Sequence, residues 1–191
     1  MVAIIAPSEV LYRDRPRGVR RLVSPLMPQP SSVTVQQVGP SRDAYTLSVL
    51  PHGRSPSSYS NPEEALVATR APNVFMNYYE SWRHGVRADE YRLDRVYMHI
   101  HIIYGMKSLQ VLSLHCDPSM KEADAHFRYK RGPHFHIEGA TPSVSRAHIA
   151  LCLMDQYFGG SDLRALMLSF GEAVRLVAGE LFPCWERASR L

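Results

Sequence analysis

The chain of 191 residues has few cysteines and no long apolar run, and each shortage excludes a class of protein. Its three cysteines, Cys116, Cys152 and Cys184, are an odd number without metal-type spacing. We therefore expect no disulfide framework and a reducing, cytoplasmic setting. No apolar run approaches the roughly 18 residues that cross a bilayer. The N-terminus lacks the basic region of a secretory signal, so no membrane partner is expected.

Excess charge is absent everywhere except in one short segment. The formal net charge is +4, and 45% of the residues are hydrophobic, which is enough for a globular core. The positions 13–21 hold one acid and five arginines, which account for the whole net charge: Arg13, Arg15, Arg17, Arg20 and Arg21. These five are the predicted contacts to nucleic acid, because arginine binds backbone phosphates. The alternative is a solubilising surface segment.

Proline divides the chain into two unequal parts. Nine of the fourteen prolines lie within residues 1–62, which disfavours long helices and central strands there. We predict that residues 1–62 form a proline-rich, arginine-containing extended arm with short edge strands at Ser32–Val38 and Ala44–Leu50. Removing residues 1–24 should then lower affinity for polyanions far more than thermal stability. We predict an α+β domain over residues 63–191.

Capping residues and periodicity predict the elements of this domain. Asn61 and Asn73 are suitable N-caps for two short helices that end near Pro72 and His84. From Tyr91 the apolar period changes to two, which predicts four strands at 91–104, 109–115, 126–130 and 134–138. The last two would pair as a hairpin. Helices at about 143–157 and 161–182 follow, so the expected fold is an antiparallel four-stranded meander covered on one face by C-terminal helices.

Histidine marks where the chemistry would lie. Seven of the nine histidines fall between positions 99 and 148, and four of them form two His-x-His pairs. Residues i and i+2 of a strand share a face, so each pair presents two imidazoles on one face and apolar side chains on the other. The predicted catalytic residues are His99, His101, His134 and His136.

Two kinds of chemistry could use this histidine-rich face. In the first, His134, His136 and Glu138 hold a divalent metal such as Zn²⁺ or Mn²⁺, whose bound water becomes a nucleophile. In the second, Arg128 and Lys130 bind a phosphoryl group of the substrate while paired histidines act as general acid and base.

The second arrangement resembles, in principle, that of the paired-histidine phosphodiesterases. Those enzymes carry a hydroxyl two residues after each histidine, where this chain has His101 and His136. The pattern is also similar to that of the histidine-triad nucleotide hydrolases, although Ile103 and Glu138 stand in place of their third histidine. The resemblances imply hydrolysis of a phosphodiester or nucleotide.

The sequence thus predicts a small protein that binds or acts on a phosphate-containing substrate, as a phosphodiesterase or nuclease. The alternative is a non-catalytic interaction or adaptor subunit, which docks a protein partner or a second copy through the sheet and the N-terminal arm. A meander between helices is similar in layout to ubiquitin-conjugating-type folds, but their His-Pro-Asn signature is absent.

Overall fold

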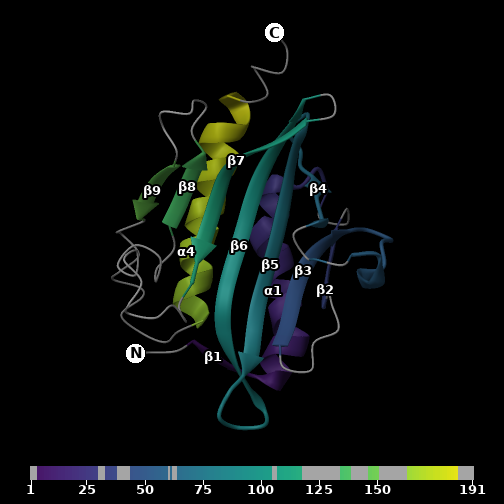
Figure 1. The fold of residues 1–191 in the computed structure, drawn as a ribbon, viewed down its shortest axis with the longest axis vertical. Helices are drawn as coiled ribbons and strands as arrows, with labels where there is room; N and C mark the ends of the chain where they lie inside the picture. The colour runs from purple at the N-terminus through teal and green to yellow at the C-terminus, as the bar shows by residue number, and fades with distance from the viewer. Residues whose placement is uncertain are drawn as a thin grey trace.

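The computed structural model describes residues 4–29, 33–37, 44–59, 61, 64–104, 107–117, 134–138, 146–150 and 163–184. These residues form an antiparallel sheet with two α-helices on the same face, α1 (Arg15–Val23) and α4 (Leu163–Leu176) (Figure 1). The fold is therefore α+β, as the sequence predicts. Of the residues described, no helix is both long enough and apolar enough to span a bilayer.

The strands are numbered in chain order. They are β1 (Ile5–Pro7), β2 (Val33–Gln37), β3 (Ala44–Pro51), β4 (Val67–Ala68), β5 (Val74–His84), β6 (Glu90–Tyr104), β7 (Lys107–Cys116), β8 (His134–Glu138) and β9 (Arg146–Ala150). The main path across the sheet is β2-β3-β5-β6-β7-β8-β9, while β1 pairs with β6 and β4 with β5. Short helical turns lie at Val10–Asp14, Ser24–Leu26, Pro56–Ser58 and Val177–Leu181.

The hydrophobic core lies between one face of the sheet and the two helices. Val96, Met98 and Ile100 alternate along β6 and are fully buried in this core. The inward faces of the helices join the same cluster through Val19, Leu22, Val23, Phe170 and Val174. Burial of such a stripe supplies most of the stability of an amphipathic helix. The face of β6 that carries Tyr97, His99 and His101 is thereby left on the far side of the sheet.

Residues before position 62 are part of this sheet and this core. The predicted edge strands exist as β2 and β3, but β3 is an interior strand between β2 and β5. The rest of the expected extended arm contains β1 and α1, and α1 tolerates Pro16 because proline at the first helical positions removes no intrahelical hydrogen bond.

Three of the predicted helical segments contain strands instead. The segment from Asn73 to His84 is mostly β5, the segment from Asn61 to Pro72 contains β4, and the segment 143–157 contains β9. In β5 an apolar spacing of four is also a multiple of the strand period of two, so the spacing alone does not separate helix from strand. The predicted helix at 161–182 is confirmed by α4 and the turn that follows it.

The predicted four-stranded meander is too small, because the described sheet has nine strands. The prediction of strands at 91–104, 109–115 and 134–138 is confirmed by β6, β7 and β8. The predicted hairpin partner of β8 is wrong, since β7 and β9 occupy its two edges. Residues 126–130 themselves lie outside the described residues.

Candidate metal centre

The histidines of three adjacent strands form two rows across the face of the sheet that is turned away from the helices. Strand register places Tyr97, His115 and His134 in the first row, and His99, Ser113 and His136 in the second. Directly opposed residues of paired strands share a face and have neighbouring Cβ atoms. Alternation along β6, β7 and β8 therefore collects imidazoles that are far apart in the sequence.

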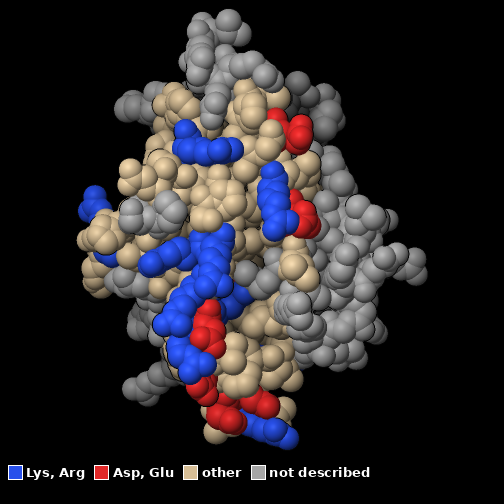
Figure 2. Space-filling model, turned by 180° about the vertical axis from the view of Figure 1, so that it is seen from behind, with Lys and Arg blue, Asp and Glu red and all other residues tan. Residues whose placement is uncertain are grey.

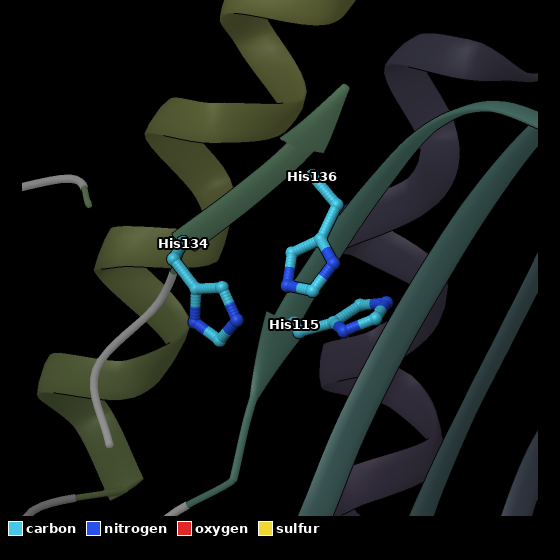
Figure 3. Close-up of side chains that lie close together, drawn as sticks. All are labelled: His115, His134 and His136. Atoms are coloured by element: carbon cyan, nitrogen blue, oxygen red, sulfur yellow. The ribbon is translucent and has the colours of Figure 1, made fainter. Parts of the chain in front are cut away.

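Three of these imidazoles converge closely. One ring nitrogen each of His115, His134 and His136 lies within 4.8 Å of the others. Figure 3 shows the rings of His134 and His136 from β8 turned toward that of His115 from β7. The ring centroids of His115 and His136 are 4.3 Å apart, and those of His134 and His136 are 4.8 Å apart. We call these three residues the histidine cluster.

His99 and His101 extend the cluster along β6. The Nε2 atoms of His99 and His115 are 3.2 Å apart, and the ring centroids of His99 and His101 are 6.3 Å apart. His99, His101 and His115 are half-buried, whereas His134 is fully buried and His136 nearly so. These five histidines therefore extend from a buried end on β8 to a more accessible end on β6. Burial lowers the pKa of His101, which favours its neutral ring.

A tyrosine and an arginine border the accessible end. The Tyr97 ring centroid lies 4.2 Å from that of His115, and its hydroxyl donates to Asp117 Oδ1 at 2.8 Å. Burial raises the pKa of Tyr97, and the charge of Asp117 raises it further, so the hydroxyl keeps its proton. The guanidinium carbon of Arg95 lies 5.8 Å from the Tyr97 ring centroid, and this side chain remains 45% exposed. The border thus offers a fixed hydroxyl and an accessible cation.

The structure changes the predicted ligand set. His134 and His136 are brought together as expected, but the third member is His115 from the neighbouring strand. The backbone of Glu138 pairs with that of Arg146, and its side chain is outside the described part of the chain. Arg128 and Lys130, the predicted phosphate contacts, also lie outside the described residues.

The sequence carries a signal for His115. Leu112 and Leu114 point into the core, so the alternation of β7 places Ser113 and His115 on the histidine face. This is the rule that singles out the two His-x-His pairs. His115 has no histidine two residues away on its own strand, so the cluster appears only when β7 and β8 are placed side by side.

The five predicted nucleic-acid contacts do not all lie on the surface. Arg15 is buried and forms an ion pair with the fully buried Glu80, with 2.5 Å from Nη2 to Oε1 and 2.9 Å from Nε to Oε2. It cannot contact a phosphate and is removed from the predicted set. Exposed side chains remain at Arg13, Arg17, Arg20 and Arg21.

The donor set of the histidine cluster suits a borderline transition metal. Imidazole nitrogen binds Zn²⁺, Cu²⁺ and Ni²⁺ well, whereas Mg²⁺ and Ca²⁺ need oxygen ligands. Zn–N bonds of about 2.05 Å in a tetrahedron place two ligand nitrogens about 3.3 Å apart. The nitrogens of the cluster lie within 4.8 Å of one another, so they would move closer together on binding one ion.

No known protein-family model, curated protein or solved structure matches the chain. A function for this protein therefore has to follow from the geometry of its own side chains.

Proposed function

We propose that the protein is a metal-dependent hydrolase that holds one divalent transition-metal ion, with Zn²⁺ the best fit, at His115, His134 and His136. The observation that carries the proposal is the convergence of three imidazole nitrogens within 4.8 Å from two paired strands. The proposed substrate contains a phosphate ester, the class that the sequence favours.

Burial supports a metal rather than a cluster of protonated histidines. Three imidazolium ions at these distances would repel one another, and the buried position of His134 and His136 would add a desolvation cost. Neutral imidazoles are the form that binds a metal. Three neutral imidazoles that share one metal ion are therefore favoured over three protonated imidazoles at this site.

The accessible end of the set supports catalysis rather than a purely structural site. Three protein ligands leave a fourth position for water, and bound Zn²⁺ lowers the pKa of that water toward 7. His99, beside His115 and half-buried, is suitably placed to accept a proton at the open side. Arg95, which is 45% exposed and lies beside Asp94, would receive an anionic group of the substrate there.

Metal content of the purified protein tests the ligand set. We expect about one equivalent of zinc per chain by plasma mass spectrometry, since His₃ sites bind zinc tightly. His115→Ala and His136→Ala should lose it, whereas His52→Ala, at an exposed turn far from the cluster, should keep it. A protein that neither contains nor takes up zinc, copper or nickel contradicts the proposal and favours the interaction subunit.

Turnover tests the catalytic part separately. We expect hydrolysis of a nitrophenyl phosphodiester that stops with a chelator and returns with Zn²⁺. His99→Gln should retain the metal and lower the rate by about 10²–10⁴, the usual contribution of a general base. Stoichiometric metal without turnover of any phosphate ester would leave a structural metal site and refute the hydrolase.

A further inference from the structure

The outer surface of α1 carries the excess positive charge of the chain. Arg17, Arg20 and Arg21 are exposed, and they recur at spacings of three and four residues, which places them on one helix face. Seen from behind in Figure 2, Lys and Arg side chains form a band along the side of the molecule on which the helices lie. We call these three residues the basic helix face.

The rotation of α1 about its axis is fixed by its buried side. Val19 and Val23 are fully buried in the core, and Arg15 is tied to Glu80. These contacts leave no freedom to turn the arginines inward. The basic helix face is thus a rigid feature of the fold and not a property of a loose segment.

The charges of this face are not neutralised within the described part of the chain. Arg13, one turn earlier, is offset by Glu9 and Asp14 at 2.7 and 3.0 Å. Arg17, Arg20 and Arg21 form no ion pair among the described residues. The charge of Asp14 also acts on Arg17, but three guanidinium groups within about one helical turn still create a local positive potential that attracts polyanions.

We propose that the basic helix face binds the phosphate backbone of a double-stranded nucleic acid without reading its sequence. Guanidinium groups make bidentate hydrogen bonds with phosphate oxygens. Arg17 and Arg21 are about 6 Å apart along the helix axis, and the phosphates of one duplex strand follow one another at a rise of about 3.4 Å along the duplex axis, so the two arginines can reach more than one phosphate. The site lies on the opposite side of the sheet from the histidine cluster, so it is independent of the proposed hydrolase activity.

The same face is poorly suited to a membrane or to single strands. Membrane-surface helices insert an apolar face between lipids, but the apolar residues of α1 are committed to the core. Single-strand binding relies on aromatic side chains that stack with bases. Tyr12 is exposed near this face, but its hydroxyl is held by that of Tyr91 at 2.7 Å and its ring packs against Tyr45. Contacts with the phosphate backbone of a duplex are therefore the binding mode that suits this face best.

The salt dependence of binding tests the proposal in the full-length protein. Fluorescence anisotropy with a labelled DNA duplex of about 20 base pairs should give a linear fall of log K with log salt. Three phosphate contacts contribute about −2.7 to the slope, which is a loss of about 40-fold between about 50 and about 200 mM salt. The triple variant Arg17→Gln, Arg20→Gln, Arg21→Gln should lose this contribution, while glutamine preserves helix propensity.

A charge-matched control separates local contacts from net charge. The variant Arg54→Gln, Arg83→Gln, Arg87→Gln removes three exposed arginines elsewhere and should keep the wild-type slope. An unchanged slope in the α1 variant overturns the proposal. Binding to anionic phospholipid vesicles in preference to the duplex also overturns it, in favour of a membrane partner. His136→Ala should bind the duplex normally, so failure of the hydrolase is distinguishable from failure of this site.

Discussion

At the scale of single residues, the pair Arg15–Glu80 places two opposite charges inside the core. Glu80 accepts hydrogen bonds from Arg15, from the hydroxyl of Tyr78 and from the indole N–H of Trp82. Burial raises the pKa of Tyr78, and the charge of Glu80 raises it further, so the hydroxyl stays a donor. These donors satisfy both oxygens of the Glu80 carboxylate. Its charge can therefore be buried without a prohibitive loss in the free energy of folding.

Breaking this pair on one side should destabilise the protein strongly. Arg15→Met leaves the Glu80 carboxylate buried without its cation, and we expect a loss of about 3–5 kcal/mol in the free energy of unfolding. The double variant Arg15→Met, Glu80→Gln removes the charge, keeps one amide oxygen to accept from Trp82 and offers an amide N–H that the Tyr78 hydroxyl can accept, so it should be more stable than Arg15→Met alone. Denaturant melts of the wild type, Arg15→Met, Glu80→Gln and the double variant measure this coupling. Additive losses would show that the pair contributes no interaction of its own.

At the scale of elements, β5 shows how one charged residue in the core can prevent a strand from being recognised in the sequence. Val74, Met76, Tyr78 and Trp82 are buried at alternate positions, and this series would indicate a strand if Glu80 did not interrupt it. With an acid in the series, the remaining spacing of four fits a helix equally well. The partner that makes Glu80 compatible with the core is 65 residues away in sequence, so no local pattern reveals it.

Asn73 has a different role from the predicted helix cap. It is the only non-glycine residue with positive φ among those described, at 58°, in the turn just before β5. Asparagine tolerates this region better than most residues, and glycine adopts it freely. The side chain was read as an N-cap because asparagine is favoured in both positions.

Two substitutions at this position distinguish turn from cap. Asn73→Gly should leave the unfolding free energy nearly unchanged, whereas Asn73→Ser should lower it by about 1 kcal/mol, because serine disfavours positive φ. Serine is as good an N-cap as asparagine, so a helix would tolerate Asn73→Ser. Urea denaturation of the two variants gives the comparison, and equal stability of the serine variant would contradict the turn.

On the scale of the whole molecule, the first part of the chain is inseparable from the sheet. Leu11, Val19 and Val23 are fully buried, and Leu22 nearly so, in the same core as β6 and α4. Each such side chain contributes about 1.5–3 kcal/mol through burial. Together they are comparable with the roughly 5–15 kcal/mol that stabilises a typical domain.

Removal of residues 1–24 should therefore unfold the protein, contrary to the expectation of a dispensable arm. We expect the truncated chain to lack a cooperative thermal transition in near-ultraviolet circular dichroism. The full-length variant with all four exposed arginines of residues 13–21 changed to glutamine is the control, since it removes charge and retains the helix. A truncated chain that melts cooperatively near the wild-type temperature would instead support the prediction of a separate N-terminal arm.

The parts of the fold that depend on local pattern could be predicted from the sequence, and the parts that depend on distant partners could not. The alternation of β6 to β8 identified the histidine face, and the stripe on α4 identified its helix. The third member of the cluster required the pairing of β7 with β8, across residues 118–133 that no pattern aligns. The burial of Arg15 likewise depends on a strand far along the chain.

The ion pair beneath α1 also helps to determine what the molecule presents to its surroundings. Val19, Val23 and the Arg15–Glu80 ion pair together set the rotation of this arginine-rich helix. The buried carboxylate of Glu80 thus makes Arg15 a structural residue, while the other arginines of this segment face outward. Loss of Glu80 would release Arg15 from its buried partner, while Val19 and Val23 keep the outward arginines in place.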